Sequence, residues 1–261
     1  MANDPANTAR WVTIVLFLGV LVMLEVGRRV GLRRMADDGT NVHEGIDRLE
    51  TAVFALLGLL IAFTFSGAAA RFDSRRQLVV EEANAIGTAY LRLDLLPAVV
   101  QPAMRDDFRR YVDSRLAVYR ALPDIAAARA ELDRSSALQR DIWGKAVAAC
   151  RMADAAPSAS MLLLPALNQM IDITTTRTVA AQIHPPAIIF GMLVVLTLAS
   201  ALLAGFDLAR GRRRSWLHAL AFAGMITVTV YVIFDLEYPR LGFIRIDAID
   251  QVLIELRASM Q

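Results

Sequence analysis

Four long apolar stretches constrain the fold of this chain more than any other feature of its sequence. They cover Trp11–Gly27, in which Glu25 is the one charged residue, and Thr51–Ala70, Ala187–Phe206 and Ser215–Phe234. Each is close to the roughly 20 residues that a helix needs to cross the hydrocarbon of a bilayer. Lipid cannot satisfy exposed backbone polar groups, and the alternating pattern of barrel strands is absent. The sequence therefore predicts four transmembrane helices.

The composition agrees with this only if charges and apolar residues are segregated along the chain. Of the 261 residues, 56% are apolar and 21% are charged, and the mean hydropathy is +0.44. Such values argue against a soluble enzyme, a disordered chain and a disulfide-rich secreted module. The single cysteine, Cys150, excludes an intramolecular disulfide and a cysteine-based metal site.

Arginines predict the topology, because both short loops between spans are basic. Their basic residues are Arg28, Arg29, Arg33 and Arg34 after the first span, and Arg210, Arg212, Arg213 and Arg214 after the third. The positive-inside rule makes these loops cytoplasmic in a bacterial inner membrane. The termini and the segment between spans two and three are then periplasmic. Arg71, Arg75 and Arg76, directly after span two, argue for the opposite orientation.

The segment between spans two and three is predicted to be a helical extramembrane domain. Prolines divide it into helices at about 71–95, 103–121, 124–154 and 158–182, and Asp124 is a candidate N-cap. Because no helix breaker follows Ala68, span two is expected to continue as one long helix. The fold class is thus an all-α membrane protein, divided into 1–70 (first helix pair), 71–184 (helical domain), 185–234 (second helix pair) and 235–261 (C-terminal extramembrane segment).

Residue patterns for catalysis are missing. His43, His184 and His218 are far apart and lack the spacing of a zinc site, so we expect structural roles for them. The sequence has no phosphate-binding loop, no nucleophile elbow and no basic face with interleaved aromatic residues. We therefore expect no enzyme activity, no cofactor, no metal and no nucleic-acid partner.

Span two carries a row of residues at helical spacing that is typical of a pore. The apolar and small members are Phe54, Leu57, Ile61, Thr64 and Ala68, with Glu50 at one end and Arg71 and Arg75 at the other. Around an axis, this row would form a hydrophobic constriction, a wider polar step and a charged mouth. The alternative is close packing, in which small residues let helices approach and the arginines pair with Asp73 or lipid headgroups. For Glu25, an ion pair with Arg28 and Arg29 is the expected environment.

Three segments together resemble the bestrophin-like family of bacterial four-span membrane proteins. They are GLLIAFTFSGAAARFDSRR (58–76), EEANAIGTAYLRLDLLP (81–97) and DLEYPRLGFIRID (235–247), and the resemblance extends from about residue 50 to the C-terminus. It marks a structural polar motif of Glu81, Glu82, Asn84, Asp235, Glu237 and Arg240. We expect Asp235, Glu237 and Arg240 to form a conformational lock against the outer helices.

The resemblance has functional implications, since the family is distantly similar to bestrophin ion channels. It implies a homo-oligomer, with a pentamer expected, in which span two lines an axis for inorganic ions across the lipid bilayer. Bestrophins keep their helical domain in the cytosol, and the acidic calcium site of the animal channels has no counterpart here. Arg71 and Arg75 favour anions weakly. The alternative function is a non-conducting membrane sensor or scaffold whose helical domain binds a partner.

Overall fold

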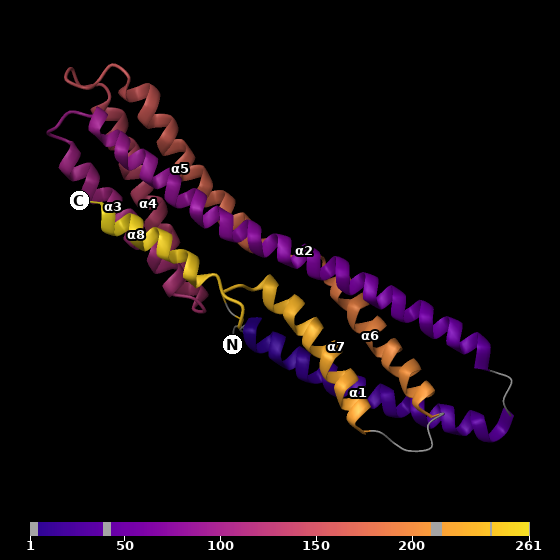
Figure 1. The fold of residues 1–261 in the computed structure, drawn as a ribbon. Helices are drawn as coiled ribbons and strands as arrows, with labels where there is room; N and C mark the ends of the chain where they lie inside the picture. Colours follow the sequence, from indigo (N-terminus) through magenta and orange to yellow (C-terminus); the bar gives the residue numbers. More distant parts are fainter. Residues whose placement is uncertain (1–4, 39–42, 210–215, 241, 261) are drawn as a thin grey trace. The chain divides into compact units, whose positions relative to one another are not determined.

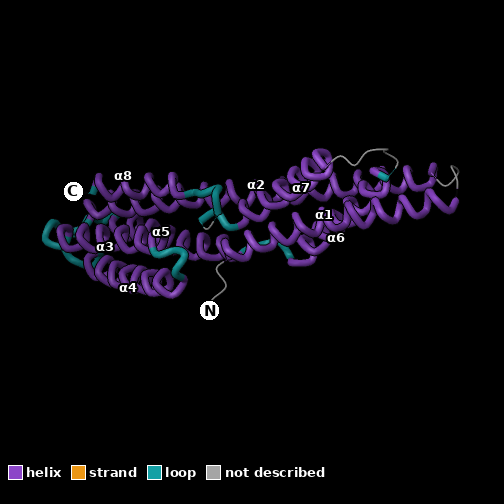
Figure 2. Tube along the Cα trace, turned by 90° about the horizontal axis from the view of Figure 1, so that it is seen from below, coloured by secondary structure: helices purple, strands orange, loops and turns teal. Residues whose placement is uncertain are grey.

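The computed structural model describes residues 5–38, 43–209, 216–240 and 242–260, and within these ranges it is all-helical, with no strand. The α-helices are α1 (Pro5–Asp38), α2 (His43–Leu91), α3 (Gln101–Arg120), α4 (Ile125–Ala149), α5 (Ala159–Gln182), α6 (Ala187–Leu208), α7 (Trp216–Glu237) and α8 (Gln251–Ser259) (Figure 1). Two 3-10 turns, η2 (Arg92–Leu95) and η3 (Asp247–Asp250), precede α3 and α8. Loops connect the helices (Figure 2).

Four of the described segments are long and apolar enough to cross a membrane, as the sequence predicts. They are Trp11–Arg34, Arg48–Leu95, Ala159–Leu208 and Trp216–Glu237. The predicted continuation of span two is confirmed, because α2 has no break between His43 and Leu91. The chain divides into unit 1 (Met1–Arg71 and His184–Tyr238) and unit 2 (Phe72–Ile183 and Pro239–Gln261).

In unit 1, α1 packs along α6 and α7. A Cβ atom at Gly205 of α6 would overlap the backbone carbonyl of Leu24, and one at Gly27 of α1 would overlap that of Leu202. Glycine thus permits direct backbone contact between α1 and α6, which is a usual device where lipid gives helices no hydrophobic reason to associate. Further along, Gly31 faces Ala209, so the C-terminal parts of α1 and α6 lie together.

This parallel packing of α1 and α6 agrees with the prediction that both basic loops lie on one side. The arginines of the second loop, Arg210 and Arg212–Arg214, fall outside the described residues. In the first basic cluster, Glu25 pairs with Arg28 at 3.2 Å and with Arg29 at 2.8 Å. The expected interfacial ion pair at Glu25 is therefore present.

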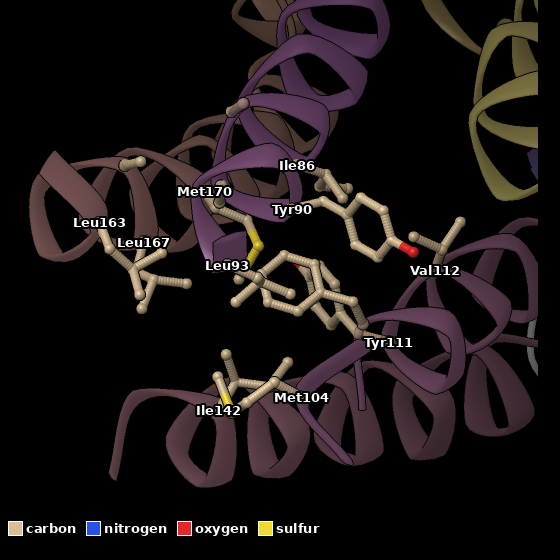
Figure 3. Close-up of a cluster of buried hydrophobic side chains, with 14 of the residues drawn as sticks. Ile86, Tyr90, Leu93, Met104, Tyr111, Val112, Ile142, Leu163, Leu167 and Met170 are labelled. Carbon is tan, nitrogen blue, oxygen red and sulfur yellow. The ribbon is translucent and has the colours of Figure 1, made fainter. Parts of the chain in front are cut away.

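Unit 2 is organised around one apolar core between the end of α2 and helices α3, α4 and α5 (Figure 3). Its fully buried members include Ile86 of α2, Tyr111 of α3, Ile142 of α4 and Leu167 of α5. The predicted N-cap is confirmed, since the Asp124 carboxylate accepts hydrogen bonds from two backbone N–H groups of the first turn of α4, both at 3.0 Å. All four helices of the predicted domain are present, with ends shifted by a few residues.

The C-terminal segment also belongs to unit 2. Leu253 of α8 is buried in the core, and the side chain of Leu256 lies against Gly87 of α2. Arg257 donates to both carboxylate oxygens of Asp113 on α3, at 2.9 and 3.1 Å. Helix α8 is therefore held by both apolar and ionic contacts.

The glycine contact between α1 and α6 makes a direct prediction about stability. Gly205→Ala places a methyl group against the backbone of α1, and we expect a loss of about 1–3 kcal/mol in unfolding free energy, the usual cost of overpacking. Gly191→Ala is the matched control on the same helix, because no atom lies within 4 Å of the added Cβ. Thermal unfolding in detergent measures both variants, and equal midpoints would contradict the proposed contact.

Candidate functional site

The row of residues predicted to line a pore faces helices of its own subunit. Its members are Phe54, Leu57, Ile61, Thr64 and Ala68. Leu57 and Ala68 are 2% and 0% exposed, and the Phe54 ring meets the ring of Phe222 on α7 edge to face, with centroids 6.1 Å apart. The Thr64 hydroxyl donates to a backbone carbonyl one turn earlier, at 2.7 Å. Ile61 and Glu50 are half-buried.

The opposite face of α2 is exposed along the span. Residues of a helix are about 100° apart, and the exposed positions fall roughly half a turn away from the predicted row. Leu59 and Phe63 are 52% and 68% exposed. The other exposed residues on this stripe, here named the outer face, are Arg48, Ala52, Ala55, Leu56, Ala62, Ser66 and Ala70 in unit 1, and Asp73, Ser74, Gln77, Glu81 and Asn84 in unit 2.

Arg71, predicted at the mouth, forms an ion pair inside unit 1. Its Nε atom lies 2.9 Å from Oε1 of Glu237, the last residue of α7. The Glu237 carboxylate is buried, and its Oε2 atom lies 3.6 Å from Nδ1 of His184. The His184 ring stacks on Tyr238 at 4.8 Å. Arg71 and His184 therefore both approach the carboxylate of Glu237. The sequence identified Glu237 as part of the polar motif but did not predict these two neighbours.

Arg75, the second predicted mouth residue, is buried within unit 2. Its guanidinium donates to the backbone carbonyls of Ala180 at 3.1 Å and Ile183 at 2.9 Å. These groups lie at the C-terminal end of α5, where carbonyls lack partners within the helix and the helix dipole favours a cation. Arg75 thus caps α5.

Glu82, from the predicted polar motif, is a fully buried carboxylate in unit 2. Arg115 of α3 donates to its Oε1 atom at 2.5 Å, and Arg177 of α5 pairs with its other oxygen. The three side chains join α2, α3 and α5. The neighbouring Glu81 and Asn84 are exposed, so the motif splits between two faces of the helix.

Arg240 connects the C-terminal segment to the same region of unit 2. It donates to both carboxylate oxygens of Asp250, at 2.7 and 2.8 Å, and its guanidinium carbon lies 4.1 Å from the ring centroid of Tyr119. Arg177 lies 4.6 Å from the same centroid. A cation placed above the face of an aromatic ring is attracted to it. Burial raises the pKa of Tyr119, while the charges of Arg115 and Arg240 act in the opposite direction.

Asp235, the remaining residue of the motif, accepts a hydrogen bond from the Tyr231 hydroxyl one turn earlier at 3.0 Å. The predicted lock of Asp235, Glu237 and Arg240 stays a prediction. Asp235 and Glu237 have contacts within unit 1, and Arg240 has contacts within unit 2.

Sequence reasoning missed Arg115, Arg177, Tyr119 and Asp250 as partners. One signal was available, because Glu82 shares a helix face with Val79, Ala83 and Ile86, all of which are buried. A carboxylate on an apolar face predicts a buried cation nearby. The sequence offered no means of choosing which of the many arginines would supply it.

Metal-binding residues do not gather in the described part of the chain, where no three His, Cys, Asp or Glu side chains are placed to hold an ion. The side chain of His43 lies outside the described residues.

The two buried ion pairs of Glu82 predict that a conservative substitution at this residue strongly lowers the free energy of unfolding. Glu82→Gln leaves two buried arginines without their carboxylate, and we expect a loss of about 3–5 kcal/mol, the usual result of removing one partner from a buried ion pair. The adjacent Glu81→Gln is the matched control, because Glu81 is exposed. Chemical unfolding measured by circular dichroism compares the two, and similar stabilities would contradict the assignment.

Comparisons with known proteins agree with this geometry. The chain is similar in structure to a bacterial bestrophin homologue from Klebsiella pneumoniae, solved as a crystal structure with one tyrosine changed to alanine. The TM-score is 0.67 at 14% sequence identity, with 94% of this chain and 99% of that chain covered, so the likeness establishes the fold. No curated protein sequence matches the chain. The model of the bestrophin-like domain matches residues 14–249, and the chain therefore belongs to the bestrophin-like family.

Proposed function

We propose that the protein is a homo-oligomeric ion channel in which α2 of each subunit surrounds the axis with its outer face. The observation that supports this most directly is how little of α2 its own subunit covers. In the most apolar window of each candidate span, 11% of the α2 residues are buried, against 22% in each of the other three. Helix α2 therefore has the most surface left for other copies and for a pore.

The order of residues along the outer face also supports a pore. Leu56, Leu59 and Phe63 are large and apolar, and Ser66 and Ala70 follow as small residues. After the span, the outer face becomes polar. A ring of large apolar side chains that opens into a polar vestibule is a usual arrangement for a channel that gates by dewetting.

The proposed lining differs from the row predicted by sequence. In that row, Leu57 and Ala68 are buried in the subunit and Phe54, Ile61 and Thr64 are half-buried, so the row offers less surface to an axis than the outer face does. We therefore propose Leu59, Phe63 and Ser66 as central lining residues. Burial of the predicted row agrees with its close-packing alternative.

Family membership supports the channel at the level of the family, because the resemblance that the sequence carries is to bestrophin ion channels. The pentamer and the bacterial inner membrane are part of this proposal. Its direct test is ion flux through purified protein in liposomes. No flux under any ionic gradient would overturn the channel and favour the sensor or scaffold alternative.

Two phenylalanines of α2 provide a matched test of the lining face. Phe63 lies on the outer face, and Phe65 lies about 160° away around the helix. If Phe63 narrows the pore, Phe63→Ala should raise single-channel conductance several-fold, whereas Phe65→Ala should leave it close to wild type. The measurement is single-channel recording in planar bilayers. An increase with Phe65→Ala alone would place the opposite face at the axis.

The orientation is tested with Cys150, the only thiol in the chain. We propose that unit 2 is periplasmic, so a membrane-impermeant maleimide should label Cys150 in intact spheroplasts. Burial raises the pKa of this thiol, which lowers the thiolate fraction at neutral pH, so labelling should accelerate as the pH rises from 7 to about 8.5. Labelling only after lysis would reverse the proposed orientation.

A further inference from the structure

We propose that the channel prefers cations, and that Glu81 is the residue that sets this preference. The inference rests on the proposed function, because it requires the outer face of α2 to surround a conducting axis. It reverses the weak preference for anions that Arg71 and Arg75 suggest in the sequence.

The two arginines are withdrawn from the outer face. Arg71 is paired with the buried carboxylate of Glu237, and Arg75 is buried against carbonyls of α5. Both lie on the covered side of α2. The charge of Arg71 is offset by the carboxylate of Glu237, and the buried guanidinium of Arg75 lies on the other side of the helix from the proposed vestibule.

The outer face after the span carries acidic residues. Asp73 is exposed and pairs with Arg76 at 3.2 Å, so that these two charges largely offset each other. Ser74, Gln77 and Asn84 are neutral. Glu81 is exposed and, among the described residues, has neither an ion pair nor a hydrogen bond. After the span, the net charge of the outer face therefore comes from Glu81, whereas Arg48 lies before the span, at the other end of α2.

Adjacent glutamates of one helix thus have different roles. Glu82 is buried and neutralised by Arg115 and Arg177, while Glu81 points about 100° away around the helix. In an oligomer, Glu81 would repeat at one height around the axis, about five turns after Phe63. A ring of carboxylates in a vestibule concentrates cations and repels anions before they reach the constriction.

The test is the permeability ratio of K⁺ to Cl⁻, obtained from reversal potentials of the full-length protein in planar bilayers under a KCl gradient. We expect wild type to favour K⁺. Glu81→Gln should lower the ratio about threefold or more, the effect of a change of about half a kT in the local energy of a unit charge, because cations and anions respond in opposite directions. Asp133→Asn is the control, because Asp133 is an exposed carboxylate on α4 rather than on α2.

A chemical restoration separates charge from structure. In a Cys150→Ser background, Glu81→Cys should show the reduced ratio, a sulfonatoethyl methanethiosulfonate should restore it, and a trimethylammonioethyl methanethiosulfonate should lower it further. If Glu81 acted only through folding, the permeability ratio would not depend on whether the attached reagent is negative or positive. Equal effects of both reagents would overturn the assignment.

The outcomes distinguish this inference from the proposed function. A pore that favours Cl⁻, or one whose ratio is unchanged in Glu81→Gln, overturns the role of Glu81 and leaves the channel standing. Absence of any current in wild type overturns the channel itself. A lowered ratio in Glu81→Gln with an unchanged ratio in Asp133→Asn supports the assignment.

Discussion

Buried and half-buried charges along α2 set which side of this helix each subunit covers with its own chain. Arg71 requires the carboxylate of Glu237, Arg75 requires the carbonyls at the end of α5, and Glu82 requires two arginines. An unpaired buried charge costs several kcal/mol, far more than a lost apolar contact of similar size. Rotation of α2 by one residue would leave several of these groups without partners. The ion pairs therefore determine the orientation of the helix as well as contributing contacts.

In this orientation, the subunit leaves the outer face of α2 uncovered. It is apolar and then small within the span and polar after it, with Arg48 before the span and Arg76 at its edge. In this chain, the same ion pairs that stabilise the subunit keep Arg71 and Arg75 away from the outer face.

Different physical effects stabilise the interior of each unit. In unit 1, helices α1 and α6 meet at Gly27 and Gly205, because lipid solvates leucine as well as protein does and backbone proximity then decides the packing. In unit 2, large side chains such as Tyr111 and Leu167 are buried from water, and the hydrophobic effect stabilises the core. Polar groups in unit 2 then select which helices meet.

The sequence by itself determined the four spans, the continuous second helix, the helices of unit 2 and the Asp124 cap, since these depend on local hydropathy, periodicity and helix breakers. It also singled out Arg71 as a charged residue at the end of span two, and Glu82, Glu237 and Arg240 as members of a structural polar motif. Only the tertiary structure decided which face of α2 is covered, because the pore row and the outer face are both apolar within the span. The partners of the charged residues on α2 are distant in sequence, as in the contact between Arg71 and Glu237. Helical periodicity carries no information about which helix supplies such a partner.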